Sequence, residues 1–142
     1  MSVNTIKEGL HAEILNAIAR LSDVRGKAHS IDEFFSNPEN TELCAYHLSS
    51  LCESLISLIK YIIVKMNHAV SELQPNNMLD ILKDKKILTH EDYEILSELI
   101  SMRDALVCPF LAQLDYEKVF NLLHEHFEEL INISEKLRRY GG

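Results

Sequence analysis

Residues 48–66 read Leu-Ser-Ser-Leu-Cys-Glu-Ser-Leu-Ile-Ser-Leu-Ile-Lys-Tyr-Ile-Ile-Val-Lys-Met, and this stretch decides the fold. Its apolar residues recur every three or four positions, at Leu48, Leu51, Cys52, Leu55, Leu58, Ile59, Ile62, Ile63 and Met66. This recurrence has the 3.6-residue period of an α-helix rather than the two-residue period of a strand. Because the apolar face is wide, we expect a core helix from about Glu39 to Ser71, against which the rest of the chain packs.

Similar patterns on either side predict further helices. They run from about Val3 to Leu21, Ile31 to Phe35, Met78 to Lys85, Thr89 to Val107 and Tyr116 to Arg139. Residues suited to cap helix N-termini stand at Ser30, Asn37, Thr89 and Asp115. We therefore predict an all-α protein with one domain, residues 1–142. In this domain an antiparallel four-helix-type bundle carries additional short helices, and about residues 1–2 and 140–142 fray.

Composition narrows the classes of function. Hydrophobic residues make up 46% of the 142 residues, and the formal net charge is −8. This charge argues against a general nucleic-acid coat but leaves room for an enzyme with a small basic cleft. No apolar run reaches the roughly 18 residues of a membrane span, and the N-terminus lacks the form of a signal peptide. We expect a cytoplasmic protein without membrane contact, with Cys44 and Cys52 as reduced core thiols.

A positive charge interrupts the apolar stripe of one predicted helix. Leu96, Leu99 and Ile100 define the stripe, and Arg103 stands where its next apolar member is expected. A charge in that place needs a partner or a wet cleft, because an unpaired buried charge is costly. Glu53 flanks the apolar face of the core helix, so we hypothesise that it pairs with Arg103 across the bundle.

Two patterns of histidine residues are candidates for a metal-binding site. Glu8 and His11 form an ExxH sequence, the local pattern of di-iron bundles, but the chain holds no second copy. His124 and His126 cannot point to one side of a helix, and His126 is interpreted as a core histidine. We therefore expect neither a metal site nor another cofactor.

Four segments beyond residue 40 carry a family resemblance. They are residues 51–56 (Leu-Cys-Glu-Ser-Leu-Ile), 78–88 (Met-Leu-Asp-Ile-Leu through Lys-Ile-Leu), 99–107 (Leu-Ile-Ser-Met-Arg-Asp-Ala-Leu-Val) and 114–119 (Leu-Asp-Tyr-Glu-Lys-Val). In these segments the chain resembles the HepT-like branch of the HEPN domains. The resemblance implies a homodimeric helical bundle and, in many members, a toxin paired with a nucleotidyltransferase antitoxin. The surplus apolar surface of the predicted helices also favours a homodimer.

The family motif is an arginine, four residues, a histidine, one residue and a tyrosine. Its first position is Arg103, followed by Asp104, but Cys108 stands at the histidine position and Phe110 at the tyrosine position. The resemblance implies a metal-independent endoribonuclease in which Arg103 binds phosphate, Asp104 orients it and Cys108 occupies the acid–base position. Histidine suits that position because its pKa lies near 6.5, whereas a free thiol titrates near 8.5.

The two departures leave alternatives open. Four explanations of Cys108 remain. The protein is a natural pseudo-enzyme, Cys108 is an introduced change that reduces the toxicity of a toxin, the protein is a weakly active enzyme, or Cys108 is a reactive thiolate activated by Arg103. Phe110 lacks the hydroxyl that, in the family, can accept nucleotides from the antitoxin. The primary hypothesis is a toxin-type ribonuclease with a degenerate site. The rival is a non-catalytic helical module that binds a nucleotidyltransferase.

Overall fold

The computed structural model describes residues 3–27, 29–66, 73–107 and 114–140, and all regular secondary structure in these ranges is helical. The helices are α1 (Val3–Lys27), α2 (Ile31–Ser36), α3 (Pro38–Lys65), α4 (Pro75–Asp84), α5 (His90–Ser101), α6 (Arg103–Val107), α8 (Tyr116–Glu125) and α9 (Phe127–Arg139). The all-α prediction is confirmed.

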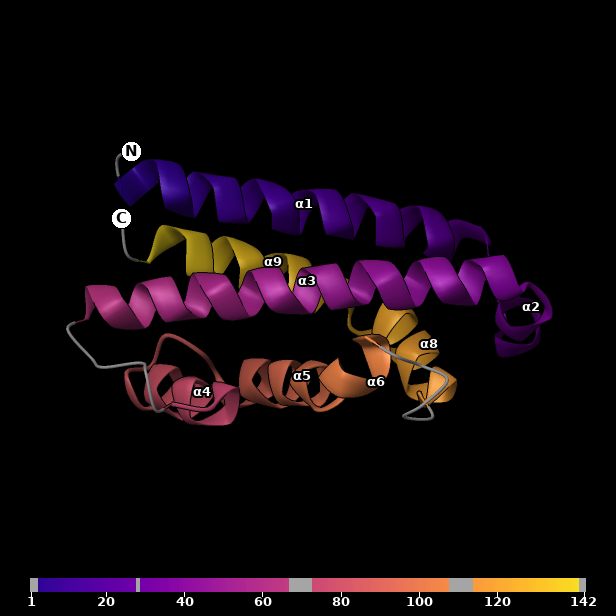
Figure 1. The fold of residues 1–142 in the computed structure, drawn as a ribbon. Helices are drawn as coiled ribbons and strands as arrows, with labels where there is room; N and C mark the ends of the chain where they lie inside the picture. The colour runs from indigo at the N-terminus through magenta and orange to yellow at the C-terminus, as the bar shows by residue number, and fades with distance from the viewer. Residues whose placement is uncertain (1–2, 28, 67–72, 108–113, 141–142) are drawn as a thin grey trace.

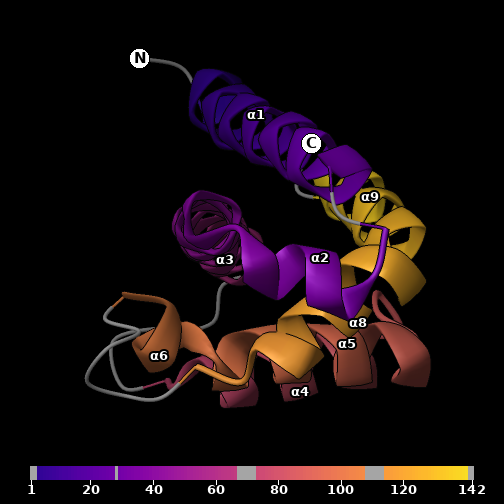
Figure 2. The ribbon, with the colours of Figure 1, turned by 90° about the vertical axis from the view of Figure 1, so that its right-hand side faces the viewer.

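The long helices run in alternating directions along one axis. Helix α1 leads away from the N-terminus, α3 returns beside it, α5 runs outward again, and α9 brings the chain back to the end where it began (Figure 1). Helix α9 packs against α1, α3 and α5, and α4 packs against α3 and α5. The view along the axis places α1 and α9 on one side of α3, with α4 and α5 on another (Figure 2). The arrangement is the predicted antiparallel bundle with short added helices.

Helix α3 forms the centre of the core. All but one of the apolar residues that predicted it are buried, each at most 2% exposed, and Met66 lies half-buried at its end. Removing each such side chain from water contributes about 1.5–3 kcal/mol, so this helix organises the fold. Among the described residues, α3 is the one helix long and apolar enough to cross a membrane, and 56% of its 18-residue apolar window is buried within the protein. A core helix passes the same test of length and composition.

The helix starts predicted from the capping residues are confirmed, whereas α4 begins at Pro75, three residues before the predicted start at Met78. Side chains accept hydrogen bonds from the first turns of their helices at Ser30, Asn37, Thr89 and Asp115. Thr89 and Asp92 form a reciprocal capping box, in which each side chain accepts from the other residue's backbone N–H at 3.1 Å. Pro38 opens α3 as its first residue, where a missing N–H costs nothing.

The first helix is longer than predicted. It continues past Leu21 to Lys27 and includes Gly26. Val24 is 3% exposed, so the buried face extends one more turn. The burial of that turn offsets the cost of about 1 kcal/mol that a glycine adds to a helix.

The last predicted helix is two helices. The chain breaks at His126, whose φ of −121° and ψ of 11° lie outside the helical region. Phe127, 4% exposed, takes the core position. His126 is only half-buried, and its Nδ1 lies 2.5 Å from Oε2 of Glu129. The interpretation of His126 as a core residue of a continuous inner stripe is therefore wrong.

The end of α3 also differs from the prediction. The helix ends at Lys65 with Met66 as its C-cap, and residues 67–72 of the predicted extension lie outside the described residues.

Candidate functional site

The predicted site begins at a break in the chain. A single helix from Thr89 to Val107 was expected, but α5 ends at Ser101 and α6 begins at Arg103. The N–H of Met102 donates to the carbonyl of Leu99 at 3.2 Å, which tightens the last turn of α5. Met102 and Leu106 are 5% and 3% exposed, so they anchor this turn in the core. The break turns the next two residues, Arg103 and Asp104, away from that core.

Arg103 reaches across to the middle of α3. Its Nε donates to Oε1 of Glu53 at 2.5 Å, and its Nη2 donates to Oε2 at 3.2 Å. The contact is a two-pronged guanidinium–carboxylate pair, the strongest geometry open to these groups. The hypothesis that Glu53 and Arg103 pair across the bundle is confirmed.

The pair lies at the protein surface. The side chains of Arg103 and Glu53 are 39% and 47% exposed. Arginine offers five N–H donors, and the two bonds to Glu53 occupy two of them. The hydrogen bond from Arg103 to Glu53 raises the pKa of the guanidinium further, so Arg103 carries its charge at every accessible pH. The geometry supplies a fixed cation with donors left for an anion.

A buried thiol lies beside the pair. Cys52 is 1% exposed, and burial raises its pKa to about 12, with Glu53 adding to the rise and Arg103 opposing it. Cys44 is fully buried, and burial raises its pKa to about 12 as well. Both cysteines are free thiols, as predicted, and neither is a nucleophile at neutral pH.

Of the other predicted site residues, Asp104 is described by the structure, whereas Cys108 is not. Asp104 is exposed and favours the charged form of Arg103 through its own charge, while the guanidinium hydrogen bonds go to Glu53. Cys108 and Phe110 lie outside the described residues. The structure therefore places Arg103 and Asp104 together at the start of α6, beside Glu53.

The ExxH pattern serves a structural contact. His11 is 6% exposed, and its Nε2 lies 3.2 Å from Oε1 of Glu135 on α9. The angles do not make this a hydrogen bond, so Nε2 remains buried without one. Among the described residues, no group of three or more His, Cys, Asp or Glu side chains could hold a metal ion.

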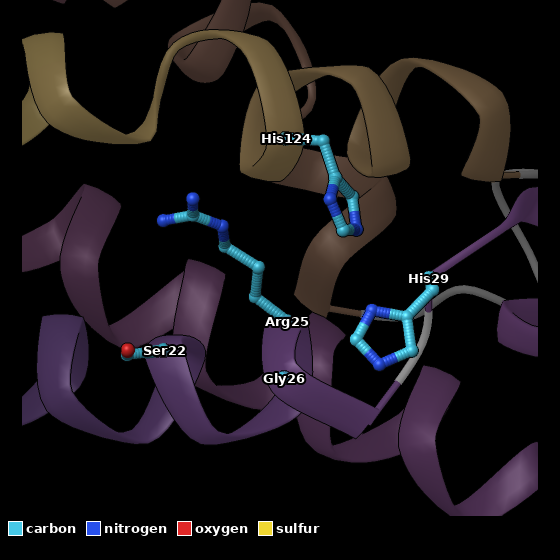
Figure 3. Close-up of a pocket in the computed structure, with 5 residues that line it drawn as sticks. All are labelled: Ser22, Arg25, Gly26, His29 and His124. Carbon is cyan, nitrogen blue, oxygen red and sulfur yellow. The ribbon is translucent and has the colours of Figure 1, made fainter.

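A second polar site was not expected from the sequence. A pocket of about 370 Å³ is lined by Ser22, Arg25, Gly26, His29 and His124 (Figure 3). The first four follow one another closely, but His124 is almost a hundred residues away in the chain. Sequence spacing holds no signal for this convergence, because only the packing of α8 near the end of α1 creates it.

The fold is an antiparallel helical bundle in which Arg103 pairs at the surface with Glu53 on the central helix α3. Residues 14–137 match the protein family described as Ribonuclease HepT-like, so the chain belongs to the HepT-like family. No curated protein matches it significantly.

Solved structures share the fold. One is a toxin–antitoxin complex with AMP-PNP: it is 16% identical, the match covers 94% of this chain and 97% of that one, and the TM-score is 0.81. Another is a tri-AMPylated HEPN toxin of Shewanella oneidensis in complex with an MNT antitoxin: 17% identical, 93% and 96% covered, TM-score 0.80. A third is YutE, a cytosolic protein of unknown function from Bacillus subtilis: 17% identical, 89% and 87% covered, TM-score 0.66.

Proposed function

We propose that this chain is the toxin component of a toxin–antitoxin pair, a single-domain cytoplasmic protein that works as a homodimer. Its site is that of a metal-independent endoribonuclease, in a degenerate form, and needs no cofactor. Arg103 binds an RNA phosphate, Asp104 helps to orient Arg103, and Cys108 occupies the acid–base position. The partner is a cognate nucleotidyltransferase antitoxin. Membership of a family described as Ribonuclease HepT-like supports the ribonuclease part of this proposal, and the likeness to solved toxin–antitoxin complexes supports the partner.

The observation that carries the proposal is the geometry of Arg103. Glu53 holds the guanidinium through Nε and Nη2 and leaves the other N–H groups for a ligand. A fixed guanidinium can stabilise negative charge that builds up on a phosphate during cleavage without first having to be oriented. A loose arginine on an open surface would have to lose side-chain entropy on binding.

The exposed face of α3 supports the homodimer. Its members follow spacings of three and four along one side of the helix and are Tyr46, Ser50, Glu53, Ser57, Lys60 and Val64. Tyr46 and Val64 are large hydrophobic residues, 69% and 54% exposed, and small serines lie between them. Such a face suits close packing against a second helix. Because Glu53 lies in the middle of this face, a second copy seated there would bring two Arg103 side chains into one cleft.

The chemistry depends on what stands at position 108. Cleavage of RNA without a metal needs a group that takes a proton from the ribose 2′-hydroxyl and returns one to the leaving oxygen. Imidazole does both near neutral pH, whereas an ordinary thiol is mostly protonated there. Losing such a group costs about 10²–10⁴ in rate. We therefore expect phosphate binding through Arg103 to persist while cleavage by the chain as it stands is weak or absent.

The Cys108 substitution favours a second candidate function. A HEPN module without its histidine would bind the nucleotidyltransferase and act through that contact rather than by cleaving RNA. Phe110 fits this role as well, because a phenyl ring has no hydroxyl for the partner to modify.

One set of variants separates the two functions. RNA cleavage and growth inhibition are measured for the chain as given, for Cys108→His and for Cys108→Ser. Activity gained by the histidine variant alone, and lost again when Arg103→Ala is added, supports the degenerate toxin. Arg20→Ala is the matched control, since Arg20 is an exposed arginine on α1.

The partner's role is tested by the double variant Cys108→His, Phe110→Tyr. Nucleotide transfer onto this variant, but not onto Cys108→His, would place control at residue 110. If no variant cleaves RNA while the chain still binds the nucleotidyltransferase, the binding module is the correct function.

A further inference from the structure

The pocket at the end of α1 gathers hydrogen-bond donors from three separate segments. Arg25 and Ser22 come from α1, His29 from the connection between α1 and α2, and His124 from α8. The rings of His29 and His124 extend from these different segments toward the same space (Figure 3). The lining contains a guanidinium, two imidazoles and a hydroxyl, and no carboxylate among the described residues. In a protein with a net charge of −8, such a lining is unusual enough to need a reason.

Three of the four lining residues with a polar side chain are held by contacts outside the pocket. The guanidinium carbon of Arg25 lies 5.1 Å from the centre of the Phe127 ring. The His124 ring lies 4.1 Å, centre to centre, from that of Phe120. The backbone N–H of His29 donates to Glu33 at 2.8 Å, which fixes the chain at that residue. The side chains of Arg25 and His124 are therefore held against aromatic rings, and a ligand does not have to order these two.

The carboxylate nearest to Arg25 does not neutralise it. Glu128 lies 3.9 Å from Arg25, beyond hydrogen-bond distance, and its side chain is 79% exposed. A pair of this kind contributes little and exchanges readily with a ligand. Arg25 also suits the negative end of the α1 dipole, but a dipole does not explain why an imidazole from α8 joins it.

The donor set selects the chemistry of the ligand. Guanidinium, imidazole and hydroxyl groups that line one pocket match the oxygens of a phosphate group. A metal ion fits poorly, because the pocket offers two imidazoles and no anionic ligand. The volume of about 370 Å³ lies at the lower end of the range for small-molecule sites.

We propose that the pocket formed by Ser22, Arg25, His29 and His124 binds a phosphate monoester. This ligand is either a free mononucleotide or the phosphorylated end of an RNA strand. The site is separate from Arg103 and is occupied whether or not the chain cleaves RNA.

Two substitutions test the pocket without disturbing the core. Arg25→Gln removes the charge from a residue that is partly exposed. Gly26→Leu adds a side chain to the lining of the pocket, and a Cβ at Gly26 meets nothing within 4 Å. Each has a matched control on α1: Arg20→Gln removes the same charge elsewhere, and Gly9→Leu adds the same side chain where a Cβ is equally unhindered.

Binding to the full-length chain is measured by calorimetry with inorganic phosphate, AMP and a short oligoribonucleotide, with and without a 5′-phosphate. We expect Arg25→Gln and Gly26→Leu each to weaken phosphate binding at least about tenfold, and both controls to bind as the parent does. AMP binding tighter than the oligonucleotide identifies a nucleotide site, and the reverse order identifies an RNA end. Binding of the oligonucleotide without a 5′-phosphate as tight as that of AMP and of the phosphorylated form, unchanged binding by Gly26→Leu, or no binding of any probe at millimolar concentration overturns the proposal.

Discussion

The pair between Arg103 and Glu53 allows a quantitative prediction. The perturbation is a double-mutant cycle of Glu53→Gln, Arg103→Gln and the combined variant. The pair has two hydrogen bonds, at 2.5 and 3.2 Å, so its coupling free energy should lie in the upper part of the range for exposed salt bridges. Exposure of 39% and 47% means that solvent screens both charges and that little was lost in bringing them together. We expect a coupling free energy of about 0.5–1 kcal/mol at moderate salt.

The assay is urea unfolding of the four proteins at low and high salt, followed by circular dichroism. The coupling should fall as salt rises, because the pair is exposed. Arg138 and Glu135, 3.3 Å apart and 38% and 36% exposed, provide a reference pair of similar exposure with one hydrogen bond in place of two. Its coupling should be smaller than that of Arg103 with Glu53.

A coupling above about 2 kcal/mol, independent of salt, would refute the reasoning. Arg103 would then be a desolvated structural clamp, since only a buried pair loses that much when it is broken. In such a clamp the remaining N–H groups of Arg103 would be enclosed rather than open to a phosphate, so the proposed role of Arg103 in RNA binding would fall with it.

Two further predictions concern titrating groups. Burial by itself raises the pKa of Asp92, but hydrogen bonds from Lys136 and Thr89 outweigh burial and lower this pKa. The charged carboxylate therefore stabilises the folded protein at pH values above the pKa of an unfolded aspartate, near 3.9. This stabilisation is lost as the pH falls through the pKa of Asp92 in the folded protein. Asp92→Asn should lower the free energy of unfolding by about 1 kcal/mol at pH 7, and this difference should shrink below about pH 4, as urea unfolding across pH would show. A difference that stays constant with pH would contradict the assignment. Cys44 and Cys52, with burial raising each pKa to about 12, should resist alkylation at pH 8 until the protein unfolds, and mass spectrometry of native protein with either residue labelled would contradict this.

Much of the fold follows from local patterns that the sequence displays. The apolar period of residues 48–66 predicts α3 as the core helix because a helix exposes a fixed face every 3.6 residues. The starts of α2, α3, α5 and α8 follow from their capping residues, because the cap bond joins residues two or three apart. A bond of such short range does not depend on the rest of the molecule.

Helix ends and breaks were harder to predict. Continuous periodicity ran through Met102 and His126, yet the chain bends at both. In each case the competition is between keeping one regular helix and burying the next apolar side chain, Leu106 or Phe127, in the core. The local pattern of apolar residues is the same for a continuous helix and for a broken one. The packing of neighbouring helices therefore decides whether the helix breaks.

The candidate site was likewise predicted in part from the sequence and determined in part by the packing of the helices. The sequence by itself determined that a cation interrupts an apolar stripe and that Glu53 is a plausible partner, because charge and period are properties of the chain. Only the tertiary structure decided that Arg103 meets Glu53 in a two-pronged pair at the surface, and that His124 joins Arg25 at a shared pocket. The partners are fifty and ninety-nine residues apart, and contacts over such separations arise from the way whole helices pack rather than from any pattern along the chain.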